Sequence, residues 1–409
     1  MRVPEVLRHR DFDLYWGGVV LSQIGTRGAV AANLYQVYEL TGSTAQVGLV
    51  GLAQAVALVV LSPLGGVYAD RLDRRRLLQA SQALALLVSA ALAAVTLAGH
   101  ATVWAVVLSS LLATAAATFD QPARQALIPA MVPREHLVDA FALLNPSREL
   151  AVLLGPALAG LLIAIGGPGL VYAFDTVTYA VLVGVLALLR TPGLKPPDGA
   201  RQPVWQSMRE GMAYVVRRPV IRQLIGLDLS ATVFGAYRVL LPALAADVWH
   251  TGATGYGLLS AAPSAGALIG SVWVFRLVRT ARSGHVVLYG TAAYGLAVVG
   301  LALAPSLWPA LVMALALGAA DAVATTVRHA AVQLETPDEL RGRVSAGYQI
   351  ASRGGPAVGD SLMGVAAGVL GPVTALAAGG LVPALTAGAS ALRSRTIREY
   401  DVSRPGATA

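Results

Sequence analysis

Residues 65–78 read GGVYADRLDRRRLL, a short segment in which two acids and four arginines stand between two long apolar runs. Charge is scarce elsewhere, because only 13% of the 409 residues are Asp, Glu, Lys or Arg. A soluble protein carries roughly 25% of such residues. A dense group of charges between apolar runs is typical of a loop at a membrane surface.

Apolar stretches long enough to cross about 30 Å of hydrocarbon recur from one end of the chain to the other. A buried helix bundle could hold one or two of them, but not a dozen. We therefore predict an all-α polytopic membrane protein with twelve transmembrane helices. The predicted spans lie near residues 12–38, 44–68, 77–98, 101–121, 138–165, 168–190, 222–247, 254–279, 285–304, 307–330, 343–370 and 372–392.

The basic residues of the loops alternate with the spans. The odd-numbered connections, near Glu39, His100, Gly167, His250, Pro305 and Gly371, contain no Lys or Arg. Arginines follow the second, fourth, eighth and tenth spans: Arg71, Arg74, Arg75, Arg76, Arg124, Arg134, Arg276, Arg279, Arg282, Arg341 and Arg343. Because basic loops stay in the cytoplasm, both termini are expected there, in the inner or plasma membrane of the cell.

The formal charge of +8 fits the same interpretation. Basic loops that face an anionic cytoplasmic leaflet account for it, so nucleic acid is not an expected partner. Cysteine is absent, which excludes a thiolate metal site and a cysteine nucleophile.

The two halves of the chain repeat. A shift of 204 residues places Gly66 on Gly270, Arg124 on Arg328 and Glu135 on Glu339, in one register. We predict two parallel six-helix repeats, at residues 1–190 and 222–409, the second ending in a short basic tail. Residues 191–221 form a proline-rich cytoplasmic linker whose second part, VWQSMREGMAYVVRRP, favours an amphipathic helix on the inner membrane surface. A solvated linker is the alternative.

The opening segment resembles the G-x-x-x-D-R-x-G-R-R loop of the major facilitator superfamily, with Asp73 where glycine usually stands. The wider runs LRHRDFDLYWGGVVLSQIG and QPARQALIPAMVPREHLVDA resemble the bacterial efflux branch of enterobactin and macrolide exporters. The resemblance implies the major facilitator fold and a cytoplasmic latch between the halves. Its residues here are Gly66, Asp70, Arg71, Arg74 and Arg75, with Arg124 as a partner of Asp70. Arginines that only fix the topology are the alternative.

A second motif lies in the fifth span. Gly155, Pro156 and Gly160 resemble the G-P-x-x-x-G pattern of drug–proton antiporters, and Gly355 and Pro356 echo it in the eleventh span. Proline frees a backbone carbonyl and glycine admits close contact, so both spans are predicted to bend or pack tightly there. The fourth predicted span lacks the membrane-buried arginine of many such antiporters.

Charges inside the spans cost at least about 2.5 kcal/mol each, so each needs a reason. We predict that Arg27, Arg238 and Asp321 face the cavity, while Gln23, Asn33 and Gln36 offer neutral hydrogen bonds to a substrate. Asp321, Asp228 and Glu149 are the candidate proton carriers. Structural ion pairs between helices are the alternative for each charge.

These observations predict a secondary active efflux transporter of a small amphiphilic or apolar organic compound. It would work by alternating access, as a proton antiporter and a monomer. No G-x-x-x-x-G-K-[ST] loop occurs, so the proton gradient, with no cofactor, is the expected energy source. A lipid or siderophore exporter, or an importer of the same fold, is the alternative. A membrane-embedded enzyme is disfavoured because the histidines are scattered and no metal-ligand spacing occurs.

Overall fold

The computed structural model describes residues 5–71, 73–191, 204–280 and 282–401, and these are helical apart from short connections. No strand occurs among them. The first half contains η1 (Glu5–Arg8), α1 (Arg10–Thr41), α2 (Thr44–Arg71), α3 (Arg74–Leu97), α4 (Val103–Met131), η2 (Arg134–His136), α5 (Leu137–Gly166) and α6 (Pro168–Leu188). The second half contains α7 (Val204–Arg217), α8 (Pro219–Leu229), η3 (Ser230–Phe234), η4 (Arg238–Leu240), α9 (Leu241–Ala243), η5 (Leu244–Val248), α10 (Gly252–Thr280), α11 (Ser283–Ala302), α12 (Leu307–Leu334), α13 (Asp338–Leu370), α14 (Pro372–Arg393) and α15 (Arg395–Arg398).

Ten segments of the described chain are long and apolar enough to cross a membrane. Two further helices, α1 with 32 residues and α13 with 33, are long enough but do not meet the same limits of apolarity and charge. Together these segments are consistent with the twelve predicted spans.

One tight turn recurs in both halves. Gly167 ends α5 with φ 81°, and Gly371 ends α13 with φ 82°. A proline follows each glycine and begins the next helix, at Pro168 and Pro372. Glycine tolerates the left-handed backbone and proline suits the first turn of a helix, so this pair stops one span and starts the next. The two turns are 204 residues apart, the same spacing as the sequence repeat.

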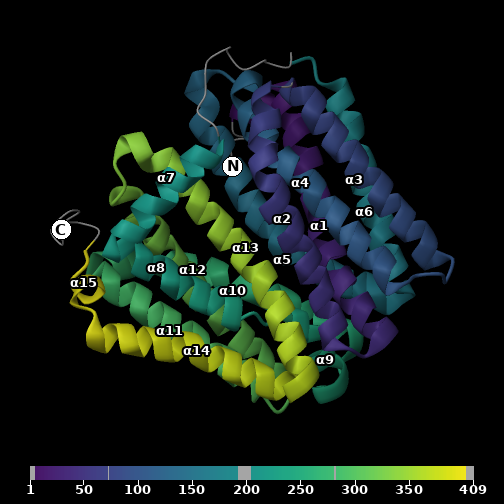
Figure 1. Cartoon of the computed structure of the whole chain (residues 1–409). Coiled ribbons are helices and arrows are strands. Elements are labelled where there is room, and N and C mark those ends of the chain that lie inside the picture. Colours follow the sequence, from purple (N-terminus) through teal and green to yellow (C-terminus); the bar gives the residue numbers. More distant parts are fainter. Residues whose placement is uncertain (1–4, 72, 192–203, 281, 402–409) are drawn as a thin grey trace. The chain divides into compact units, whose positions relative to one another are not determined.

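The chain divides into two compact units. Unit 1 comprises residues 1–41 and 53–200, and unit 2 comprises residues 42–52 and 201–409. The boundary at residue 200 lies in the predicted linker. In unit 1, α1 packs on α4, α5 and α6, while α3 packs on α4 and α6. In unit 2, α11 packs on α12 and α14, and α10 packs on α12 (Figure 1).

The two copies of the glycine–proline motif lie at close helix contacts. A Cβ atom at Gly155 of α5 would lie 2.9 Å from the backbone nitrogen of Gly28 in α1. A Cβ atom at Gly355 of α13 would lie 2.7 Å from the hydroxyl of Thr232 in η3. Gly160 is buried in α5, and Pro156 and Pro356 lie inside their helices.

A helix occupies the position of the predicted amphipathic segment. This helix, α7, packs on the amino-terminal part of α13, where a Cβ atom at Gly211 would lie 2.7 Å from the carbonyl oxygen of Arg343. The hydroxyl of Tyr214 donates to the carbonyl of Glu335 at 2.8 Å. Glu210 forms an ion pair with Arg343. One face of α7 thus packs on α13 within unit 2, and the predicted contact of α7 with the membrane surface stays a prediction.

The seventh span is irregular. It runs from Pro219 to Val248, but within that range only α8 and the short α9 are α-helical. Two π turns, η3 and η5, and the 3₁₀ turn η4 make up most of the rest. The chain is not helical at Ala236 and Tyr237, and the carbonyl of Gly235 accepts a hydrogen bond from Tyr294 at 2.9 Å. Such bulges bend a helix and free backbone groups at its centre.

Candidate functional site

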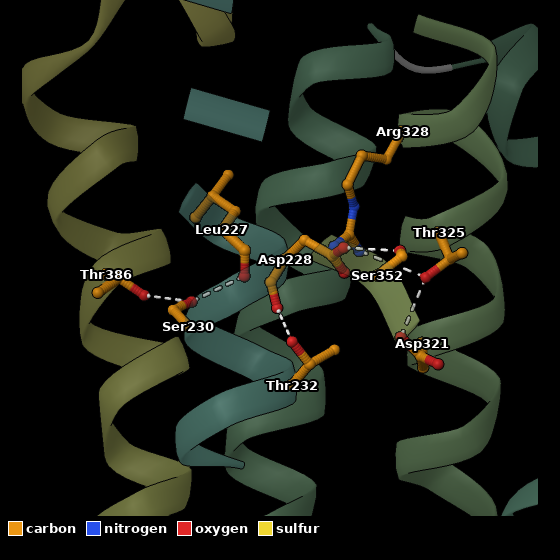
Figure 2. Close-up of polar contacts among 9 residues, drawn as sticks. All are labelled: Leu227, Asp228, Ser230, Thr232, Asp321, Thr325, Arg328, Ser352 and Thr386. Carbon is orange, nitrogen blue, oxygen red and sulfur yellow. Dashed lines mark hydrogen bonds and ion pairs between the residues drawn. The ribbon is translucent and has the colours of Figure 1, made fainter. Parts of the chain in front are cut away.

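A buried cluster of polar groups joins three helices of unit 2 (Figure 2). Arg328 of α12 forms an ion pair with Asp228 of α8, and their side chains are only 1% and 4% exposed. The hydroxyl of Ser352 in α13 donates to the second carboxylate oxygen of Asp228 at 3.0 Å. Both oxygens of Asp228 therefore have a donor, which an ion removed from water requires.

A second carboxylate, Asp321, belongs to the same cluster. The hydroxyl of Thr325 donates to Asp321 Oδ1 at 3.1 Å, and Arg328 Nη2 donates to the same hydroxyl at 3.4 Å. Thr325 therefore links Asp321 to the guanidinium that pairs with Asp228 (Figure 2). Asp321 is half-buried. The cluster holds two acids and one arginine, and its arginine is bound directly to Asp228.

The irregular span carries a second ion pair. Arg238 Nη2 lies 2.6 Å from Asp360 Oδ2 of α13. The Asp360 side chain is 2% exposed, whereas that of Arg238 is 40% exposed. Asp360 thus fixes one edge of the Arg238 guanidinium, and the rest of the Arg238 side chain is partly exposed. An arginine held in this way can present its other N–H groups to an anionic ligand.

Unit 1 has a different arrangement around its own arginine. Arg124 pairs with Asp120, one turn earlier in α4, and the amide of Gln82 in α3 donates to Asp120 at 2.9 Å. The structure thus gives Arg124 a carboxylate partner within its own helix. The partnership between Arg124 and Asp70 that the motif implies involves a side chain outside the described residues.

The neutral residues of the first span form contacts between helices. The amide of Asn33 donates to Ser110 of α4 at 2.9 Å, and Gln36 accepts from Tyr172 of α6 at 2.8 Å. Both side chains are buried, whereas Gln23 is half-buried and Arg27 is exposed. In this structure Asn33 and Gln36 tie α1 to its neighbours, and their contact with a substrate stays a prediction.

Of the three candidate proton carriers, the structure brings two together. Asp228 and Asp321 share the cluster around Arg328, with Thr325 between them. Glu149 lies on α5 of unit 1 and is exposed. Asp228 and Asp321 are therefore the pair whose charges act on each other.

The charged segment at residues 65–78 lies partly within the described residues. Gly66, Asp70 and Arg71 belong to α2, but their side chains lie outside the described residues. Asp73 caps α3 by accepting from the backbone N–H of Arg76 at 3.0 Å, which gives a reason for an acid where the motif has glycine.

Two arginines of that segment are half-buried. Arg75 donates to the carbonyls of Leu186, Ala187 and Thr191 at 3.1–3.3 Å, so it binds the carboxyl end of α6 within unit 1. Arg74 is half-buried at the start of α3. The latch role of both arginines stays a prediction.

Several members of these clusters were not candidates from sequence. They are Gln82, Asp120, Thr325, Arg328, Ser352 and Asp360, although the repeat aligned Arg328 with Arg124. That alignment was a usable signal, because an arginine at the equivalent position of both halves, in or next to an apolar span, needs a partner. For Asp120 the signal was the four-residue spacing from Arg124 on one helix.

Comparisons with known proteins agree with this architecture. A family model described as "Transmembrane secretion effector" matches residues 5–405. The enterobactin exporter EntS of Shigella boydii serotype 18 is 31% identical over 346 residues, which cover 84% of this chain and 82% of that protein. EntS of Escherichia coli strain 55989 is 30% identical with the same coverage.

Solved structures share the fold. The nucleoside transporter NupG superposes with a TM-score of 0.76 at 15% identity, covering 94% of this chain and 100% of that one. A bacterial homologue of the iron transporter ferroportin gives a TM-score of 0.72 at 16% identity, covering 94% of this chain and 99% of that one. The chain is thus a multi-pass membrane transporter and not an enzyme. It belongs to the transmembrane secretion effector family of the major facilitator superfamily.

Proposed function

We propose that this protein exports a small organic compound of the siderophore type across the cell membrane in exchange for protons. Two similar proteins are named as enterobactin exporters, which supports efflux and this class of cargo. The proposal includes both termini in the cytoplasm, a monomer and no cofactor, with the proton gradient as the energy source.

The observation that carries the proton coupling is the pair of acids beside one arginine. Asp228 has Arg328 and Ser352 as partners, so both of its oxygens are occupied within the ion pair. Asp321 receives a neutral hydroxyl bond from Thr325 and is half-buried. Of the two, Asp321 is therefore the acid that can gain and lose a proton without leaving Arg328 unpaired.

The coupling follows from charge. With Asp321 ionised, the cluster carries two negative charges and one positive charge, and the extra charge is costly inside a membrane. A proton on Asp321 makes the cluster neutral. Because Asp228 lies on the irregular seventh span and Asp321 on α12, a change in how these helices pack alters the environment of the proton. Exchange of that proton between the two sides would drive the cycle.

Arg238 is the proposed cargo-binding residue in unit 2. Its guanidinium is fixed on one side by Asp360 and is 40% exposed on the other, as binding an oxygen-rich anionic group requires. Gln23 and Arg27 are the proposed contacts in unit 1, together with Asn33 and Gln36.

The experiment is transport of enterobactin into inverted membrane vesicles with an imposed pH difference. The wild-type protein should accumulate the compound only when protons can leave the vesicle interior. Asp321→Asn should bind the compound at equilibrium but fail to accumulate it. Asp338→Asn is the control, because Asp338 has a side chain that is 82% exposed and pairs with Arg341 outside the cluster.

Two outcomes would overturn the proposal. Wild-type transport that is indifferent to the pH difference would remove the proton from the mechanism and leave a uniporter or an exchanger of other ions. Accumulation in right-side-out vesicles instead of inverted ones would identify an importer. Normal coupling in Asp321→Asn would contradict the assignment of the proton to Asp321 while leaving proton exchange itself in place.

A further inference from the structure

An open surface cavity of about 410 Å³ lies in unit 2, at the end of α14. The helices α8 and α15 lie beside that end (Figure 1). Two arginines line it, Arg393 at the end of α14 and Arg395 at the start of α15. The other polar groups on its wall come from Gln223, Ser390, Ser394 and Thr396. No Asp or Glu is among the lining residues, so the wall consists of cations and neutral hydrogen-bonding groups. This composition suits an anion.

The groups on the wall are held in place. The hydroxyl of Ser394 donates to the side-chain oxygen of Gln223 at 2.7 Å. With that oxygen occupied, the NH₂ of Gln223 is the part of the amide that can donate to a ligand. The same Ser394 oxygen caps α15 by accepting from the backbone N–H of Ile397 at 3.4 Å.

The short helix α15 is itself anchored to the rest of unit 2. Ile397 is fully buried, and the backbone N–H of Gly284 in α11 donates to the carbonyl of Tyr400 at 3.0 Å. A Cβ atom at Gly284 would lie only 1.6 Å from the carbonyl oxygen of Ile397. Arg395 therefore projects from a fixed element, and the cavity is part of the folded unit.

The exposed face of α14 indicates which kind of anion the cavity would bind. Leu381, Leu385 and Leu392 are 45%, 67% and 81% exposed and lie on one face of the helix. Ala389, on the same face between Leu385 and Leu392, belongs to the cavity wall. An apolar stripe on a membrane helix thus leads directly into a cavity with two arginines. A phospholipid has both parts that match, acyl chains for the stripe and a phosphate for the cavity.

We propose that this cavity binds the phosphate headgroup of an anionic membrane lipid, whose acyl chains lie along the leucine stripe of α14. The predicted orientation places the end of α14 at the cytoplasmic surface, where the leaflet is anionic. Basic pockets beside transmembrane helices on that side are suited to such headgroups. Free phosphate shares the chemistry of the headgroup but would not use the leucine stripe.

The test uses the purified full-length protein in a mild detergent, titrated with phosphatidylglycerol or with phosphatidylcholine and followed by native mass spectrometry. The wild-type protein should retain phosphatidylglycerol in preference to phosphatidylcholine. The double variant Arg393→Gln/Arg395→Gln should bind phosphatidylglycerol at least about tenfold more weakly, because each basic residue at an anionic surface contributes appreciably. Arg398→Gln is the matched control, since Arg398 lies in α15 but not on the cavity wall.

Each other outcome overturns the proposal. Equal binding of the two lipids would exclude recognition of the headgroup charge, and unchanged binding in the double variant would exclude the cavity. Competition by inorganic phosphate at the same concentration as the lipid would identify a phosphate site instead. If the double variant does not fold, Ser390→Phe fills the cavity without changing its charge. Undiminished lipid binding in that variant would likewise overturn the proposal.

Discussion

Arg124 and Arg328 stand 204 residues apart, at the same place in the two halves, yet each takes its carboxylate from a different position. In unit 1 the partner is Asp120, on the same helix. In unit 2 it is Asp228, on another helix. In the other half, the position equivalent to Asp120 is Ala324 and the position equivalent to Asp228 is Ile24. The pair of unit 1 therefore moves with one helix, whereas that of unit 2 ties α12 to the seventh span.

Breaking the buried pair of unit 2 should be strongly destabilising. Asp228→Asn or Arg328→Gln leaves one buried charge unpaired, so each should lower the free energy of unfolding by about 3–5 kcal/mol. The double variant Asp228→Asn/Arg328→Gln should lose less stability than either single variant, because it leaves no unpaired charge at this buried pair. Denaturation by SDS in mixed micelles measures all three.

The exposed pair of Asp338 and Arg341 is the control for this prediction. Its side chains are 82% and 49% exposed, so neutralising Asp338 should change the stability by no more than about 1 kcal/mol. If the double variant were as unstable as the sum of the two single variants, the two residues would act independently.

Asp11 gives a prediction on pH. This residue precedes the first predicted span, and its Oδ2 accepts from the backbone N–H groups of Arg190 and Thr191, both at 2.8 Å, and from the Thr191 hydroxyl at 2.7 Å. Burial opposes ionisation, but these hydrogen bonds hold the pKa of Asp11 below its usual value. A lowered folded-state pKa stabilises the protein above the unfolded pKa of about 3.9, and the stabilisation is lost as the pH falls through the lowered value.

Asp11→Asn should therefore melt at a lower temperature than the wild-type protein at pH 7, and the difference should shrink as the pH falls below the unfolded pKa of about 3.9. Thermal melting at pH 7 and at a series of lower pH values measures it. Asp13→Asn is the control, because Asp13 is exposed two residues away. A difference that persisted unchanged at low pH would mean that the ionised carboxylate is not the stabilising form.

At the scale of the helix, glycine decides how closely α10 and α12 approach. A Cβ atom at Gly318 would lie 1.9 Å from the carbonyl oxygen of Pro263, and one at Gly266 would lie 1.9 Å from that of Leu315. Small residues of this kind allow membrane helices to pack through their backbones. The contact is therefore sensitive to a single methyl group.

Gly318→Ala should destabilise unit 2 by about 1–3 kcal/mol, because the helices must move apart. Gly226→Ala is the matched control, since nothing lies within 4 Å of the added Cβ atom. Alanine favours a helix by about 0.5–1 kcal/mol over glycine, so this variant should be neutral or slightly more stable. Thermal melting of both variants tests the prediction, and equal melting temperatures would contradict it.

The elements also show what the sequence could predict. Apolar length and the absence of basic residues near His100, Gly167 and Gly371 located most of the spans. The breaks in the seventh span were missed, because the interruption at Gly235 arises from packing and from the hydrogen bond that Tyr294 donates. Periodicity also found α7, but it could not show that one face of this helix packs on α13.

At the candidate site, the sequence predicted several of the charged residues but not the hydroxyl groups that bind them. Asp228, Asp321 and Arg238 were recognised because charge inside an apolar span is conspicuous. Thr325 and Ser352 were missed, because hydroxyl residues are common in membrane helices and only the fold brings these two to the carboxylates. Which acid meets which arginine depends on helix packing.

At the scale of the whole molecule, the distribution of arginine predicts the topology. The chain has no cysteine of its own, so single-cysteine variants can be labelled without background. His100→Cys should react with an impermeant maleimide added to intact cells, whereas Ala200→Cys should react only after the cells are opened. Labelling of the cysteine at position 200 from outside would contradict the orientation.

The latch is the second prediction at this scale. Asp70→Asn should lower the rate of transport while the protein is still inserted and expressed, because the resemblance gives this acid a role in the cycle and not in folding. Vesicle transport and quantified expression measure the two effects separately. Normal transport would leave the arginines of the segment with a role in topology alone.

The irregular seventh span has a mechanical consequence. A 3₁₀ turn advances about 2.0 Å per residue and an α-helix about 1.5 Å, so rewinding the three residues of η4 from one to the other changes the length by about 1.5 Å. The span from Pro219 to Val248 contains both kinds of turn and two wider π turns. Interconversion of these turns would lengthen or shorten the span while its ends stay in place. A regular helix meets a thicker or thinner bilayer by tilting, whereas rewinding would give this span a second way to do so.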